Sequence, residues 1–285
     1  MTNEIVTRTA VVLFSEPPSL ESVYGVAASS TLDARRVEMT ETLVRAELGA
    51  GTLEVSLFGS AWPDEDEESL AELGGPSAGL FPGALARAGG QDALWPGGAR
   101  AADAHRAFAL LQLTEPKSGP KLQMEALERA GVALLAHPGA LCVFFPAGES
   151  LRDGNVIGGI RAMAKEQGAL PLQIWINGRV ADAGQGVRVA DVVGLGQLGQ
   201  MDQEAVFPDR PGLEPFEVLG YLFDVTHHLF NEGGDLEEGV VYEGPGGLRW
   251  RASLGHAAQI PPARGIVRWI PLSGSEDGGP EAGTA

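Results

Sequence analysis

Residues 171–234 constrain the fold of this chain more than any other stretch, because they combine two kinds of hydrophobic periodicity. Apolar residues recur at every second position over 172–176, which is the spacing of a half-buried strand. The glycine-rich sequence 183–186 predicts a tight turn, since glycine adopts positive φ without strain. Valines over 187–193 predict the return strand. A strand hairpin followed by one long helix is therefore expected.

The long helix is expected over residues 215–231. Pro215 suits the first turn of a helix, where its missing N–H removes no hydrogen bond, and Gly233 and Gly234 are expected to end the helix. Its apolar side chains fall in two rows: Phe216, Leu219, Phe223 and Phe230, and then Val218, Leu222, Val225 and Leu229. Both rows are expected to be buried against the sheet. Only the polar stripe of Glu217, Asp224 and His228 is expected to contact water.

The remaining elements are short. Strands are expected at 10–14, 42–48, 52–58, 108–113, 141–145, 240–242, 248–252 and 266–270, and helices after Ser19, from 120 to 135 and after Asn155. The strand–helix crossovers predict some parallel pairing and the hairpins predict antiparallel pairing. The fold class is therefore α+β, a mixed, largely antiparallel sheet with helices mainly packed on one face. Residues 8–272 are expected to form a single unit, with possible sub-parts 8–60 and 105–272.

Residues 60–104 are expected to form a loop-rich acidic insertion, and residues 273–285 a disordered tail. An acidic run of this kind is usually only solvated, but it could also receive a basic partner. The candidate interaction surface consists of Trp62, Asp64, Glu65, Asp66, Glu67, Glu68 and Trp95.

The net charge limits which classes of molecule this protein is expected to bind. There are 38 acidic and 20 basic residues, which gives a net charge of −18. Such a surface repels phosphate backbones and anionic lipids, so nucleic acid and membranes are not expected as partners. A protein partner, basic in charge, is compatible with it.

Cys142 is the single cysteine, so no intrachain disulfide can form, which suits a reducing compartment. The apolar residues around it indicate a buried small side chain rather than a catalytic thiolate. No apolar run approaches the length of about 20 residues that spans a membrane. A cytoplasmic location is expected.

Gly194, Gly196 and Gly199 form a G-x-G-x-x-G pattern directly after a strand. A dinucleotide site requires a helix to open at this turn, so that its N–H groups meet the pyrophosphate. The following residues lack a helical apolar stripe before Pro208. A glycine-rich bend that leaves the sheet is the favoured interpretation, and a cofactor site is the alternative.

Asp224 and His228 lie one turn apart on the long helix, on the same face as Glu217 and Tyr221. A carboxylate and an imidazole at this spacing can share a metal ion. No third ligand is evident, so a solvated polar stripe is the favoured interpretation. His227 is expected to face the apolar side as a hydrogen-bonded core residue.

Several segments resemble an uncharacterised bacterial family of domains of unknown function. They are Glu16-Pro17-Pro18-Ser19-Leu20, Trp95-Pro96, Leu170-Pro171-Leu172-Gln173-Ile174-Trp175-Ile176, Val193-Gly194-Leu195-Gly196-Gln197-Leu198-Gly199 and residues 221–230. The family carries no catalytic motif and implies no activity. Tyrosines are common in it where His227 and His228 stand here, which weakens the case for a metal.

These observations predict a cytoplasmic, non-enzymatic protein that acts by binding another protein, as an immunity- or chaperone-like factor, with no cofactor. The alternative is an enzyme, either metal-dependent through Asp224 and His228 or nucleotide-binding through Gly194, Gly196 and Gly199.

Overall fold

The computed structural model describes residues 7–29, 32–91, 94–232, 236–255 and 258–272, and these divide into two compact units. The first unit runs to Asn177 and also takes in Val193–Gln200. The second comprises Gly178–Val192 and the residues from Met201 on. The boundary therefore lies elsewhere than between the expected sub-parts 8–60 and 105–272. The expected tail 273–285 and helix stop at Gly233 and Gly234 lie outside the described residues.

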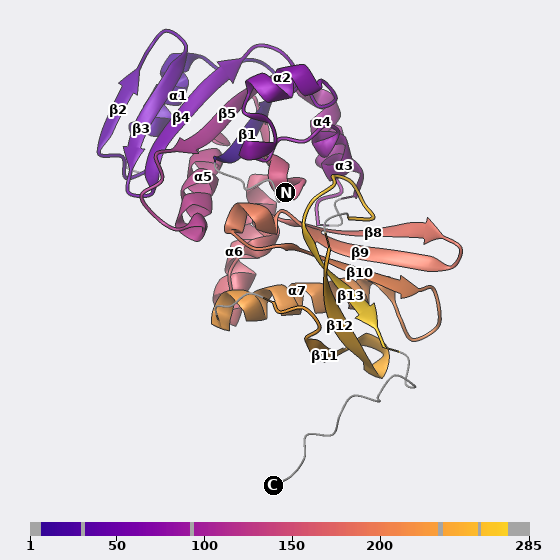
Figure 1. Ribbon diagram of the computed structural model, residues 1–285. Helices are drawn as coiled ribbons and strands as arrows, with labels where there is room; N and C mark the ends of the chain where they lie inside the picture. Colours follow the sequence, from indigo (N-terminus) through magenta and orange to yellow (C-terminus); the bar gives the residue numbers. More distant parts are fainter. Residues whose placement is uncertain (1–6, 30–31, 92–93, 233–235, 256–257, 273–285) are drawn as a thin grey trace. The chain divides into compact units, whose positions relative to one another are not determined.

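The first unit contains a sheet in the order β2-β3-β4-β5-β1-β6-β7, in which every neighbouring pair is antiparallel (Figure 1). The strands are β1 (Arg8–Phe14), β2 (Arg36–Met39), β3 (Leu43–Leu48), β4 (Gly51–Phe58), β5 (Ala107–Thr114), β6 (Ala140–Phe145) and β7 (Ser150–Arg152). Helix α5 (Pro120–Leu134) connects β5 to β6. The crossover gives no parallel pair because β1 lies between these two strands and bonds to both.

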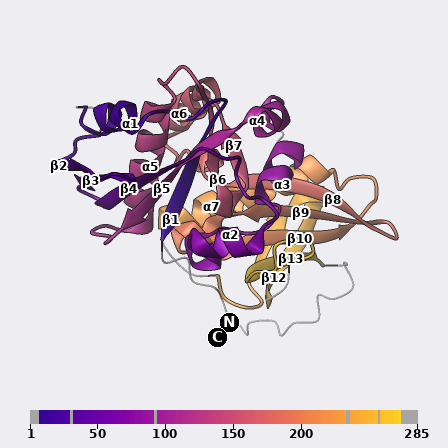
Figure 2. The ribbon, with the colours of Figure 1, turned by 90° about the horizontal axis from the view of Figure 1, so that it is seen from above.

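Helices cover both faces of this sheet, which differs from the expectation of helices mainly on one face. On one face lie α5 and α1 (Leu20–Ala27); on the other lie α2 (Glu67–Glu72), α3 (Ala84–Gln91) and α4 (Gly98–Ala104). Figure 2 looks down on the strands, with α1 and α2 on opposite sides of them. Alternate residues of β6 serve the two faces: Val143 contacts Gly131 of α5, whereas Phe144 joins the cluster under α2 to α4.

The expected loop at 60–104 thus folds largely into helices. Its apolar side chains form one core with the sheet, through Trp62, Leu70, Ala78, Leu80, Ala84, Leu85, Ala88 and Ala101. Burial of this many side chains explains why a glycine- and alanine-rich sequence is held in one structure.

The prediction of a strand at 172–176 is wrong. Residues Leu172–Ile174 form a 3₁₀ turn, and strand β8 (Asn177–Gly184) starts only afterwards. The alternation misled because Trp175 and Ile176 are as fully buried as Leu172 and Ile174. Burial of consecutive residues such as Trp175 and Ile176 does not follow the alternation of a half-buried strand.

Gly148 lies against this turn. A Cβ atom at position 148 would sit 1.9 Å from the carbonyl oxygen of Trp175. Gly194, with φ of 105°, packs on the other side, where a Cβ would lie 2.4 Å from the Cα of Gly148. Three chain segments therefore meet at a spacing that only glycine permits.

Gly148→Ala should lower the free energy of unfolding by about 1–3 kcal/mol or more, because the clash is with backbone. The matched control is Gly158→Ala in helix α6 (Gly154–Gln167), which has nothing within 4 Å of the added Cβ. There the change should stabilise by about 0.5–1 kcal/mol, since alanine favours helices. Urea titrations of both variants provide the measurement, and equal effects would contradict the close approach.

The second unit contains a sheet in the order β11-β12-β13-β10-β9-β8, antiparallel except for the parallel pair β10–β13. Its further strands are β9 (Val187–Val193), β10 (Asp202–Pro208), β11 (Val241–Gly244), β12 (Leu248–Gly255) and β13 (Ile266–Pro271). With two mostly antiparallel sheets, the α+β class is confirmed. No helix among the described residues is long and apolar enough to cross a membrane.

Helix α7 (Pro215–Glu232) packs against β10, and only one of its two apolar rows is fully buried. Val218, Leu222, Val225 and Leu229 are buried, as predicted. In the other row Leu219 is buried as predicted, but Phe216 is 70 % exposed, and Phe223 and Phe230 are half-buried. The expectation of burial is therefore wrong for the exposed Phe216. This residue lies two positions, or about 200°, from Val218 around the helix.

Leu222→Ala should therefore cost about 2–5 kcal/mol of folding free energy, because it leaves a cavity between α7 and the sheet. Phe216→Ala removes a larger side chain from the same helix but should change stability by no more than about 0.5 kcal/mol. Thermal unfolding of the two variants measures the difference. A larger loss of stability from Phe216→Ala than from Leu222→Ala would contradict the packing of the Leu222 side of α7 against the sheet.

Candidate functional site

The acidic run at 64–68 is built into the helices that follow it. Asp66 caps α2: its carboxylate accepts hydrogen bonds from the backbone N–H of Glu68 at 3.1 Å and of Ser69 at 3.2 Å. The Ser69 hydroxyl donates a third at 2.7 Å, and these bonds lower the pKa of Asp66, the hydroxyl most. Asp66 is thus fixed by the helix that it begins.

Asp64 caps a different helix. Its carboxylate accepts from the backbone N–H of Leu85 at 2.7 Å and of Ala86 at 2.9 Å, in the first turn of α3. These hydrogen bonds span 21 and 22 residues of the sequence and connect the acidic run to α3. Glu65, Glu67 and Glu68 are exposed. The run therefore consists of two structural aspartates and three glutamates that face water.

The two tryptophans of the expected interaction surface differ in position. Trp62 is only 5 % exposed, with its ring edge-on to Phe108 and Phe144 at centroid distances of 5.2 Å and 5.9 Å. Its backbone N–H donates to Nε2 of His105 at 2.9 Å. Trp62 is therefore a core residue and cannot contact a partner directly. Trp95 is half-buried.

Gly194, Gly196 and Gly199 belong to a 3₁₀ turn, Leu195–Leu198, between β9 and β10. No α-helix opens here, so the N–H array that a dinucleotide pyrophosphate needs is missing from this turn. The side chain of Gln197 instead donates to the Trp175 carbonyl oxygen at 2.8 Å. The turn holds the chain segments around Gly148 together.

The predicted polar face of α7 is only partly exposed. Glu217, Asp224 and His228 are exposed, but Tyr221 faces the sheet, 5.8 Å from Trp250 and 5.7 Å from Trp269 between ring centroids. Burial raises the pKa of Tyr221. Aromatic packing of this ring against the sheet explains why Tyr221 is not exposed with the other residues of the polar stripe.

Asp224 and His228 are thus two exposed side chains one turn apart, and the His228 ring also packs edge-on to Tyr242 at 6.1 Å. Within the described ranges no group of three or more acidic, histidine or cysteine side chains is arranged to hold a metal ion. The neighbouring His227 is half-buried, and this burial lowers its pKa while Asp224 raises it.

Cys142 lies in β6 and is completely buried. Desolvation raises the pKa of its thiol, so the thiolate that nucleophilic catalysis needs is disfavoured. Its role in the sheet is that of a small apolar side chain, as predicted.

A buried ion network in the second unit is the feature that sequence reasoning missed. Asp191 on β9 accepts from Arg179 on β8 with both oxygens, at 2.9 Å and 2.5 Å. Arg264 also donates to Asp191, at 2.6 Å, and reaches Asp202 on β10 at 2.5 Å. Asp191 and Arg179 are at most 1 % exposed.

The network continues along β10 to β13. Glu204, completely buried, accepts from Arg268 at 2.8 Å and from the backbone N–H of Gln259 at 2.6 Å. Arg264 also donates to the carbonyls of Ile260 and Pro262. Charged groups from four strands thus hold the 259–264 segment over one face of the sheet, and each of these hydrogen bonds is charge-assisted.

Asp191→Asn should destabilise the protein by about 3–5 kcal/mol, because it leaves the buried guanidinium group of Arg179 and the partly buried one of Arg264 without their shared carboxylate. The control is Glu38→Gln, which breaks the exposed pair between Arg36 and Glu38 at 2.5 Å. That change should cost no more than about 1 kcal/mol. Chemical unfolding of both variants gives the values. If Asp191→Asn were as mild as the control, the network would not be closed to water.

No curated protein and no solved structure matches the chain. A family model matches residues 191–270. This region includes the resembling segments 193–199 and 221–230, and also Asp191, Asp202 and Glu204 of the ion network. The expected resemblance to an uncharacterised family is confirmed for this region: residues 191–270 match the model of the family described as a domain of unknown function, DUF4261.

Proposed function

We propose that this protein acts in the cytoplasm by binding a basic protein partner, as an immunity- or chaperone-like factor without enzymatic activity of its own. The observation that carries the proposal is the arrangement of Glu65, Glu67 and Glu68. These side chains face water, while the aspartates between and before them are fixed as helix caps.

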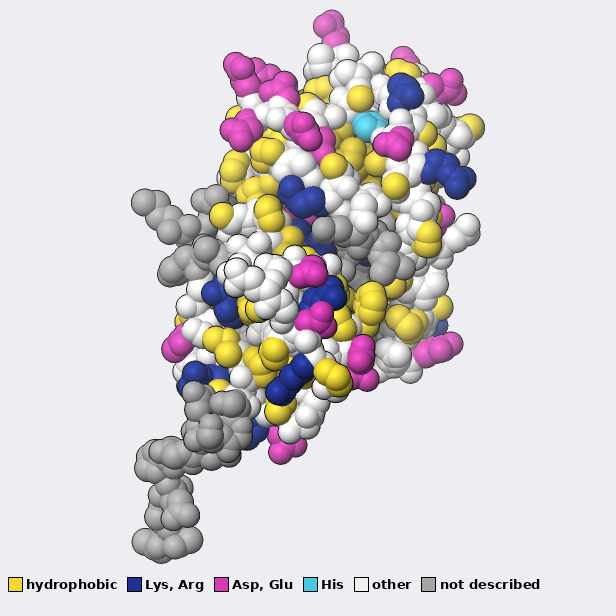
Figure 3. All heavy atoms as spheres, turned by 90° about the vertical axis from the view of Figure 1, so that its right-hand side faces the viewer, with side chains coloured by type: hydrophobic (Ala, Val, Ile, Leu, Met, Phe, Trp, Pro, Cys, Tyr) yellow, Lys and Arg dark blue, Asp and Glu magenta, His cyan; other side chains and the backbone are white. Residues whose placement is uncertain are grey.

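A fixed acidic surface suits protein recognition for energetic reasons. Binding a partner costs the conformational entropy of the segments that become ordered, and a backbone already held by two caps and by Trp62 loses less. The net charge of −18 adds long-range attraction for a basic protein and accelerates the encounter. Figure 3 shows one face of the protein, with a group of acidic side chains near its upper end.

The enzymatic alternative has weaker support. It would use Asp224 and His228, which are two exposed side chains, or Gly194, Gly196 and Gly199, which form a 3₁₀ turn. Neither arrangement converges on a position where a substrate atom could lie between two functional groups. Protein binding therefore remains the function that the geometry favours.

The triple variant Glu65→Gln, Glu67→Gln, Glu68→Gln removes three exposed charges and leaves both capping aspartates. Affinity capture from native cells at low and at moderate salt should recover basic proteins with the wild type, and the triple variant should lose them. Capture should also weaken as the salt concentration rises, since the attraction is screened over about 8–10 Å.

The matched control is Glu41→Gln, Glu166→Gln, Glu237→Gln, which removes the same charge from three exposed sites elsewhere. It should retain the captured proteins. Thermal unfolding of both triple variants ensures that a lost partner does not reflect a lost fold. Capture of no protein at either salt, or equal capture by the two triple variants, would contradict the proposal.

A further inference from the structure

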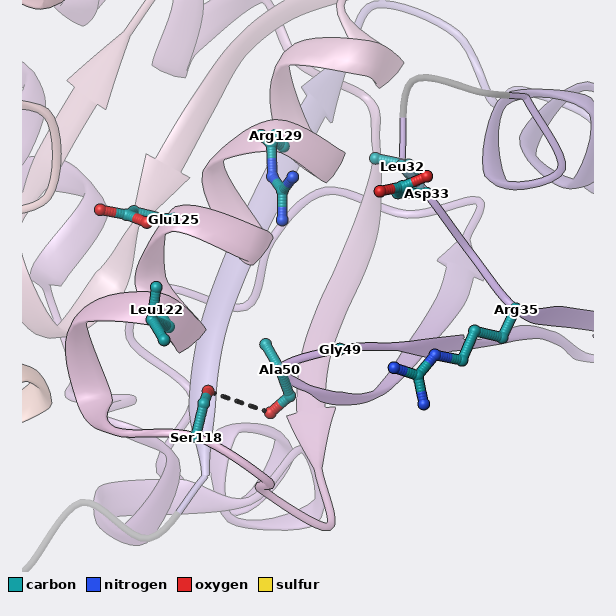
Figure 4. Close-up of a pocket in the computed structure, with 9 residues that line it drawn as sticks. All are labelled: Leu32, Asp33, Arg35, Gly49, Ala50, Ser118, Leu122, Glu125 and Arg129. Carbon is teal, nitrogen blue, oxygen red and sulfur yellow. Dashed lines mark hydrogen bonds between the residues drawn. The ribbon is translucent and has the colours of Figure 1, made fainter.

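A cleft in the first unit lies between α5 and the β3–β4 hairpin, away from the acidic run. Its volume is about 290 Å³, close to the lower end of small-ligand sites. Leu32 and Leu122 provide apolar walls, and the backbone at Gly49 and Ala50 provides the floor. Figure 4 shows Arg129 from α5 and Arg35 from the segment before β2 directed into the space between these elements.

The two arginines differ from eight others of the chain, which have carboxylate partners. Carboxylates pair with Arg36, Arg45, Arg87, Arg161, Arg179, Arg188, Arg264 and Arg268. In a chain with 38 acidic residues such pairing is easy to achieve. Arg35 and Arg129 nevertheless make no ion pair with any residue that the structure describes. Their guanidinium groups are left with donors free for a ligand.

Two carboxylates also line the cleft, but neither forms an ion pair with the guanidinium group of Arg35 or Arg129. Glu125 lies one turn before Arg129, the spacing at which a Glu–Arg pair supports a helix, yet the two form no ion pair. In Figure 4 the Glu125 carboxylate is turned away from Arg129. Asp33 also lines the cleft, with φ of 56°, and likewise forms no ion pair with either arginine.

We propose that this cleft binds a small organic or inorganic oxyanion, whose carboxylate or phosphate group is held between Arg35 and Arg129. A planar guanidinium presents paired N–H donors that match two oxygens of such a group. Ser118 adds a hydroxyl, bonded only at 3.4 Å to the Ala50 carbonyl and therefore able to turn to a ligand. Leu32 and Leu122 would contact the apolar part of the ligand.

The test uses the full chain, with sodium phosphate and sodium succinate as probes at constant ionic strength. Isothermal titration should give saturable binding of one equivalent, and the side-chain N–H signals of Arg35 and Arg129 should shift with the same midpoint in NMR spectra. Arg35→Gln and Arg129→Gln should each weaken binding at least about tenfold. Binding of phosphate alone identifies a phosphorylated ligand, and binding of succinate alone identifies a carboxylate.

Arg100→Gln is the matched control, because Arg100 is also exposed in the first unit but lies on α4, outside the cleft. It should bind both probes as the wild type does. Arg129→Lys, which keeps the charge but loses the paired donors, should bind more weakly than the wild type. No saturable binding of either probe at millimolar concentrations, or equal weakening by Arg100→Gln, would overturn the proposal.

Discussion

The second unit depends on one carboxylate that two arginines share. Asp191 lies opposite Glu204 in the pairing of β9 with β10, and both are completely buried. Without Arg179 and Arg264 beside Asp191, and Arg268 beside Glu204, these negative charges could not remain on one face of a sheet away from water. The arginines come from β8 and from the segment before β13, so that the first and last parts of the unit are held by the same side chain. Packing of α7 on the opposite face then completes the unit.

The first unit is organised differently, around close backbone contact rather than charge. Gly148, Gly194 and the Trp175 carbonyl meet where no side chain fits. Around them lie buried polar groups that satisfy backbone atoms, such as the Ser150 hydroxyl, which donates to the Ile174 carbonyl at 2.7 Å. Glu128 is another buried group: desolvation raises its pKa even though Arg161 donates to it at 2.5 Å and opposes the shift. Buried polar side chains thus stabilise irregular segments whose backbone lacks the hydrogen bonds of a sheet.

Local patterns in the sequence predicted α7 and most of the strands, including β1 and β6, which are buried on both faces. They failed where a buried segment is irregular or polar. Leu172–Ile174 form a turn, and Trp175 and Ile176 after it are both buried, so the alternation does not mark two faces of a strand. Strand β10 was not predicted because Asp202, Gln203 and Glu204 are polar, and their burial depends on Arg264 and Arg268, which are distant in sequence. The helices at 67–104 were missed since they are short and rich in glycine and alanine. For the candidate site, the exposure of Glu65, Glu67 and Glu68 was predictable, but the burial of Trp62 and the capping by Asp64 depend on contacts distant in sequence.

The capping pattern of the acidic run has an evolutionary consequence. Asp64 and Asp66 begin α3 and α2, and a longer side chain at either position would lose the short reach that a cap needs. The glutamates between and after them carry no such duty. Substitutions can therefore accumulate at 65, 67 and 68 without disturbing the helices, while 64 and 66 stay fixed. The charge of this surface can therefore change through these three positions alone, on an unaltered scaffold.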